Sequence, residues 1–187
     1  MSADERPMRA DARRNHGRLV VAARELFNEH GPEASLDDIA RRAGVGAGTL
    51  YRHFPSRQAL LAAVYLHDVE QIASRADELA TQYPPDEALH RWLRHQLDYV
   101  TSLQGLGGAI KAMLSGDHET LAICRDTMRA AVGRLLVPAQ EAGLIREDVE
   151  PANVLRLVHG VGMACEAAPE QAELLLRIVI DGLRPAP

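Results

Sequence analysis

The chain has 187 residues, of which 47% are hydrophobic and 4% aromatic, and its formal net charge at pH 7 is −5. This hydrophobic fraction excludes global disorder, and the scarcity of aromatic strand formers favours an all-α fold. The net negative charge argues against a uniformly basic nucleic-acid binder.

The charge is unevenly distributed along the chain. The segment through His67 carries 10 arginines against 8 acidic residues, whereas the remainder carries 11 basic residues against 18 acidic ones. This asymmetry permits one end of the molecule to approach DNA.

Cys124 and Cys165 are isolated thiols without metal-ligand spacing, and no apolar run reaches the ~18 residues of a membrane span. We therefore expect a reduced, cytoplasmic protein with no membrane association, metal or cofactor.

Residues 1–12 mix charged side chains with Pro7 and predict a flexible arm. Apolar residues then recur at helical spacing as far as Gly31-Pro32, a pair that typically ends a helix. The sequence therefore predicts a first helix that ends near residue 30.

Two short helices joined by a glycine turn follow. Ser35 begins a capping-box-like start in which its hydroxyl can accept a hydrogen bond from the amide of Asp38. Gly44 ends this second helix after about two turns, and Gly46 opens a third helix that runs through Phe54.

A longer connector helix is predicted from about residue 57 to residue 80, with Pro55-Ser56 as stop signal and N-cap. Short breaks then separate further helical patterns, so that about nine helices are expected in all. The later ones are predicted over residues 86–103, 106–115, 118–142, 151–167 and 170–183.

The window from Ser35 to Leu61 is the most informative part of the chain, because a helix, a tight turn and a second short helix are the plan of a helix-turn-helix. In that arrangement the first helix braces the second, whose N-terminal part enters a major groove about 12 Å wide.

The residues of this window resemble the TetR family of transcriptional repressors, which show the pattern A-x-x-A-G-V-S-x-G-T-L-Y-x-H-F-x-x-K. The matching positions are Ala40, Ala43, Gly44, Val45, Gly48, Thr49, Leu50, Tyr51, His53 and Phe54. The resemblance covers about residues 14–64, and the end of the chain resembles the SbtR-type subgroup.

The resemblance implies that Tyr51 and His53 contact DNA phosphates and that Arg57 stands where the family has a phosphate-binding lysine. Leu50 and Phe54 are instead expected to pack the third helix onto the first.

Two departures from the family pattern leave few groups to read bases, because Gly46 replaces the usual serine and Ala47 a polar residue. A thymine methyl can be contacted by Thr49, while Arg42, Arg52 or an arginine of the arm can donate hydrogen bonds. The expected DNA-binding residues are Ser35, Arg42, Gly46, Ala47, Thr49, Tyr51, Arg52, His53 and Arg57.

The last two predicted helices, 151–167 and 170–183, are apolar around much of their circumference. We expect them to form a homodimer interface, as in proteins that resemble TetR, and paired half-sites about 34 Å apart require a dimer. The alternative is that both helices are buried within one subunit.

Polar or soft side chains interrupt the apolar faces of the C-terminal helices and suggest a pocket for an unidentified small-molecule effector. The alternative for each of them is a place in the core. These residues are Trp92, Gln96, Tyr99, Met113, Met128, His159 and Met163.

We therefore expect a helix-turn-helix DNA-binding domain over residues 13–60 and an effector-binding and dimerisation domain over residues 61–187. The predicted function is a homodimeric repressor released from a palindromic operator by an effector. No pattern of a catalytic or zinc site occurs, so an enzyme is not expected. Two alternatives are a sequence-tolerant architectural DNA-binding protein and a ligand-binding or scaffolding helical protein that no longer binds DNA.

Overall fold

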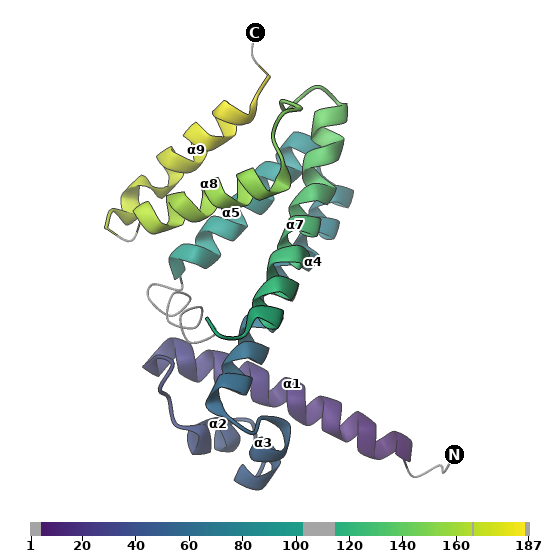
Figure 1. Cartoon of the computed structure of the whole chain (residues 1–187), viewed down its shortest axis with the longest axis vertical. Coiled ribbons are helices and arrows are strands. Elements are labelled where there is room, and N and C mark those ends of the chain that lie inside the picture. Colours follow the sequence, from purple (N-terminus) through teal and green to yellow (C-terminus); the bar gives the residue numbers. More distant parts are fainter. Residues whose placement is uncertain (1–4, 103–114, 166, 186–187) are drawn as a thin grey trace. The chain divides into compact units, whose positions relative to one another are not determined.

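A computed structural model describes residues 5–102, 115–165 and 167–185, and every regular element within them is helical (Figure 1). This confirms the all-α fold. The expected helix over residues 106–115 lies almost wholly outside the described residues. The α-helices are α1 Glu5–His30, α2 Leu36–Arg42, α3 Ala47–His53, α4 Arg57–Gln82, α5 Pro85–Ser102, α7 His118–Glu141, α8 Pro151–Ala164 and α9 Ala172–Leu183, and a 3-10 turn, η1 Pro169–Gln171, precedes α9.

The start of α1 lies within the expected arm. The helix begins at Glu5, so residues 5–12 of the expected arm are helical and continuous with the predicted first helix. Pro7 falls in the first turn of the helix, where the backbone N–H that proline lacks would have no intrahelical partner. Proline is therefore compatible with helix at this position.

The helices form two compact units. The first contains α1, α2, α3 and the start of α4 as far as His67, together with the described residues 115–118. Its core is aliphatic and aromatic. Leu50 and Phe54 of α3 are buried, in agreement with the packing role expected for them, and Leu26 and Phe27 of α1 are buried as well. Burial of this α3 face leaves the opposite face of the helix for other contacts.

The second unit begins at Asp68 and contains the rest of α4 together with α5, α7, α8 and α9. Helix α5 packs on α8 and α9, which also pack on each other (Figure 1). The buried Trp92 donates its indole N–H to the Ile72 carbonyl at 2.9 Å and so joins α5 to α4. Arg134 of α7 pairs with Asp77 of α4 at 2.6 Å.

None of the helices in residues 5–102, 115–165 and 167–185 has the length and apolar character of a membrane span. The same residues hold no group of three or more His, Cys, Asp or Glu side chains placed to share a metal ion.

Candidate nucleic-acid interface

The start of α2 is fixed by the predicted cap. Ser35 has extended backbone angles, φ −64° and ψ 125°, and its Oγ accepts a hydrogen bond from the Asp38 amide at 3.3 Å. Asp37 and Asp38 lie in the first turn, where negative charge is favourable. The cap therefore defines where the first helix of the helix-turn-helix begins.

A left-handed glycine makes the turn between α2 and α3. Gly44 has φ +64°, its N–H donates to the Arg41 carbonyl, and the next N–H, of Val45, donates to Ala40. This pair of hydrogen bonds is the Schellman arrangement that ends helices at glycine. From α1, the Arg18 guanidinium donates to the Gly44 carbonyl at 3.4 Å and occupies the space that a Cβ at residue 44 would need.

Helix α3 is buried on one face and exposed on the other. Gly46 is its N-cap, with no side chain to close the helix end. The exposed face carries Ala47, Gly48 and Arg52 together with Tyr51, whose side chain is 51% exposed. Of the expected DNA-binding residues, Gly46, Ala47, Tyr51 and Arg52 are thus exposed together at this helix, and Thr49 is half-buried on it.

His53 at the end of α3 is half-buried beside two rings. The ring of His16, on α1, lies with its centroid 6.0 Å from that of His53 and 4.9 Å from that of Phe54. Burial lowers the pKa of His16 below 6.5, and a positive charge on His53 lowers it further.

Arg57, at the start of α4, makes internal contacts. Its Nη1 donates to the carbonyls of Pro32 at 3.0 Å and Ala34 at 2.6 Å, and its Nε lies 3.7 Å from a carboxylate oxygen of Glu33. It therefore holds the loop before α2 onto α4. A guanidinium has five N–H donors, so these contacts leave capacity for a phosphate oxygen.

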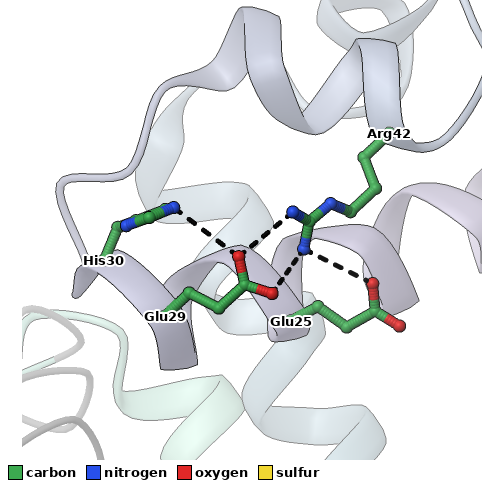
Figure 2. A network of polar contacts seen from close by, with 4 residues as sticks. All are labelled: Glu25, Glu29, His30 and Arg42. Atoms are coloured by element: carbon green, nitrogen blue, oxygen red, sulfur yellow. Dashed lines mark hydrogen bonds and ion pairs between the residues drawn. The ribbon is translucent and has the colours of Figure 1, made fainter.

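Arg42 also has partners inside the protein (Figure 2). Its guanidinium makes a two-pronged contact with Glu29, at 2.7 and 3.1 Å, and lies 3.7 Å from Glu25. The pair with Glu29 raises the pKa of Arg42 and lowers that of Glu29. His30 lies 3.6 Å from the same carboxylate. Arg42 therefore connects the end of α2 to the end of α1.

Sequence reasoning missed Arg18. Arg13, Arg14, Gly17 and Arg18 of α1 line a shallow groove together with Arg42. The excess of arginines through His67 indicates only that this end of the molecule can approach DNA, because which arginine faces the turn depends on the packing of α1 against α2. That packing is a tertiary property, and no local pattern could have identified Arg18.

The residues expected to line an effector pocket are only partly brought together. Trp92, Gln96 and Tyr99 share one face of α5, and the Tyr99 hydroxyl donates to the Asp68 carboxylate at 3.2 Å. Met128 is buried in α7. His159 and Met163 are exposed on α8, and Met113 lies outside the described residues.

Helices α8 and α9 present apolar side chains to solvent. The exposed ones are Leu157 and Met163 on α8 and Leu174 and Ile178 on α9. Other apolar residues of these helices, Val154, Val158, Leu176 and Leu183, are buried within the second unit. Some apolar residues of the two helices thus belong to the core of the subunit, while others form an apolar surface that is exposed in a single chain.

Two family models match the chain. The model of bacterial regulatory proteins of the tetR family matches residues 19–64, and that of the transcriptional regulator SbtR-like C-terminal domain matches residues 84–185. The chain belongs to the TetR family. The resemblance seen in the helix-turn-helix and at the end of the chain is confirmed.

Individual relatives agree with this membership. The regulator UidR of Escherichia coli is 28% identical over an alignment of 169 positions, which covers 81% of this chain and 79% of UidR. The repressor LfrR of Mycolicibacterium smegmatis is 41% identical over 90 residues, 46% of this chain and 47% of LfrR. The crystal structure of the TetR regulator SCO0520 from Streptomyces coelicolor is 36% identical, covers 92% of this chain and 99% of its own, and has a TM-score of 0.75.

The chain is therefore a DNA-binding transcriptional regulator and not an enzyme. TetR-family regulators act as dimers on operator DNA and bind small-molecule effectors rather than cofactors.

Proposed function

We propose that this regulator is a homodimeric repressor that binds a palindromic operator and leaves it when a small-molecule effector binds the C-terminal domain. The DNA-binding domain spans residues 13–60, and residues 61–187 bind the effector and dimerise. The name of the relative LfrR, a transcriptional repressor, supports repression as the direction of control.

The exposed face of α3 is the observation that carries DNA binding. Its buried face is fixed by Leu50 and Phe54, and the turn before it is fixed by Gly44 and Arg18. A short helix held this rigidly, with small residues at its N-terminal end, can enter a major groove without reorganising.

Phosphate contacts come from the edges of this face. Tyr51 is exposed, and His53 and Arg57 follow it at the end of α3 and the start of α4. Ser35, Gly46 and Ala47 lie at the two helix starts, where backbone amides can meet the DNA backbone. Arg42 contacts DNA only by leaving Glu29, so its main role is to hold α2 against α1.

Dimerisation uses the exposed apolar residues of α8 and α9. A single helix-turn-helix makes too few contacts for tight specific binding, and two of them about 34 Å apart read consecutive major grooves. Apolar side chains such as Ile178, 58% exposed, and Leu174, 46% exposed, are more favourable against a second copy than in water.

Effector binding is supported by one polar atom in particular. Gln96 Oε1 is buried and has no hydrogen-bond partner in the described part of the chain, so an effector with a donor group would satisfy it. The proposed pocket residues are Trp92, Gln96, Tyr99, Met113, Met128, His159 and Met163.

Helix α4 runs from one unit into the other and can therefore couple the two domains. An effector that favours the DNA-incompetent state by ~1–3 kcal/mol would weaken operator binding ~5–150-fold.

Selection of bound duplexes from a random DNA pool tests this function. We expect a palindrome with half-sites about one helical turn apart. An enriched site without symmetry would contradict dimeric recognition, and no enrichment would contradict a sequence-specific regulator.

A second candidate function is sequence-tolerant, architectural DNA binding. The observation in its favour is the run Gly46-Ala47-Gly48, which places no polar side chain at the start of α3. Architectural binding would fall with salt equally on every duplex, whereas a repressor keeps a preference of ~10³-fold or more for one site.

A further inference from the structure

Arg52 differs from the other arginines near the helix-turn-helix, because its contacts lie on the recognition helix itself. Its Nε donates to the Gly48 carbonyl at 3.2 Å, and its Nη2 donates to Thr49 Oγ1, also at 3.2 Å. The guanidinium is thus folded back along the exposed face of α3, toward the N-terminal end of the helix.

The N-terminal end of α3, toward which this guanidinium is folded, carries only small residues. A Cβ at Gly46 or at Gly48 would meet nothing within 4 Å, and Ala47 between them carries only a methyl group. The edge of a base pair can therefore approach the helix closely, and Arg52 and Thr49 hold the polar side-chain groups on this part of α3.

The other arginines of α2 and of the start of α4 are held by charged or backbone partners. Arg42 is bound to Glu29 at 2.7 Å, and Arg41 to Asp38 at 2.5 Å. Arg57 donates to two loop carbonyls. The partners of Arg42 and Arg41 are carboxylates, so moving either arginine to DNA separates two opposite charges, whereas the partners of Arg52 are a neutral carbonyl and a neutral hydroxyl.

The chemistry of the group matches one base. Two of the guanidinium's five N–H donors are used within α3, and the planar fork that remains fits the adjacent acceptors O6 and N7 of guanine. The Thr49 hydroxyl is turned to Arg52, so Thr49 fixes the direction of the fork.

We infer that Arg52 is the specificity-determining residue of α3, that it reads one guanine in each half-site from the major groove, and that Thr49 positions it. This inference rests on the proposed function, because it requires that the protein select a DNA sequence. It adds the base that is read and the side chain that reads it.

The test compares selected sites from a random DNA pool for the full-length wild type, Arg52→Ala, Thr49→Val and, as matched control, Arg41→Ala on the exposed side of α2. We expect the site selected by the wild type to hold a guanine at the same position of both half-sites. Replacing this guanine should weaken binding of the wild type about 5–150-fold, whereas the affinity of Arg52→Ala should hardly change. Thr49→Val should reduce the preference in part, and Arg41→Ala should retain it.

Each other outcome is also decisive. If Arg52→Ala selects the same palindrome with the same preference for guanine as the wild type, the inference alone is overturned. The inference is also overturned if Arg52→Ala loses affinity equally for all duplexes, because that result would indicate a phosphate contact. No palindrome from the wild type overturns the proposed function and the inference together. Far-UV circular dichroism of each variant establishes that it is folded. The variant Arg52→Lys keeps the positive charge but not the planar fork, so it should keep its affinity for random DNA while losing the preference for guanine.

Discussion

Gly162 of α8 lies directly against Val100 of α5, and a Cβ at residue 162 would overlap the Val100 Cγ1 methyl. The Leu97 Cδ1 methyl is 3.8 Å from the same point. Glycine therefore permits the close approach of α5 and α8. Val100 is β-branched and stiff, so it cannot easily move aside.

Substituting Gly162 by alanine should accordingly destabilise the protein by ~1–3 kcal/mol, the usual cost of overpacking a core. Urea denaturation measures it, and the double variant Gly162→Ala/Val100→Ala should recover part of the loss. Gly133→Ala on α7 is the control, because its Cβ would meet only Pro151 Cγ at 3.7 Å. It should be neutral or stabilising by ~0.5–1 kcal/mol, and equal losses at both glycines would contradict the close contact.

The turn between α2 and α3 gives a second prediction. Gly44→Ala should lower stability by ~1–2 kcal/mol, because φ +64° is unfavourable for residues with a Cβ and because the Arg18 guanidinium must move. Urea denaturation and affinity for the selected operator measure the effect. Gly17→Ala, on the exposed side of α1 with nothing within 4 Å of its Cβ, should leave both unchanged or slightly improved. A wild-type affinity for Gly44→Ala would show that the turn does not position α3.

These two glycines show what the sequence can and cannot predict. Gly44 and the Ser35 cap act through neighbours in the chain, so their pattern predicted the turn and the start of α2 correctly. Gly162 instead contacts Val100, and Arg42 contacts Glu29. The residues of each pair are far apart in the sequence and meet only because their helices pack together. The sequence therefore placed the helix-turn-helix but could not predict that Arg42 pairs with Glu29 or that Arg18 contacts the turn.

The pair of Arg42 and Glu29 makes stability depend on pH. Since the pKa of Glu29 is lowered from 4.5 in the folded state, its contribution is present above pH 4.5 and is lost as the pH falls through the folded pKa. Arg42→Gln should return the pKa of Glu29 toward 4.5, as followed by nuclear magnetic resonance of the side-chain carboxyl. Arg41→Gln, whose arginine pairs with Asp38 instead, is the control and should leave the Glu29 titration unchanged.

His16 should titrate below 6.5 in the folded protein, because burial disfavours its charged form and His53 repels it. The folded state then binds fewer protons than the unfolded state, so this group lowers stability as the pH falls below 6.5. Histidine proton resonances measure the pKa directly. His53→Gln should raise it only in part, since burial is the larger cause, and a midpoint at or above 6.5 in the wild type would refute the assignment.

The exposed apolar face of α8 and α9 yields the last prediction. Ile178→Glu places a charge where a second copy would bury an apolar side chain, and an unpaired buried charge is unfavourable. Sedimentation should therefore show monomers at concentrations where the wild type is a dimer. Val137→Glu on α7 is the matched control, because Val137 is 47% exposed but lies outside this face. Since one protomer reads one half-site, Ile178→Glu should also lose the preference for a palindrome while keeping weak affinity for random DNA. A variant that remains dimeric would place the interface elsewhere.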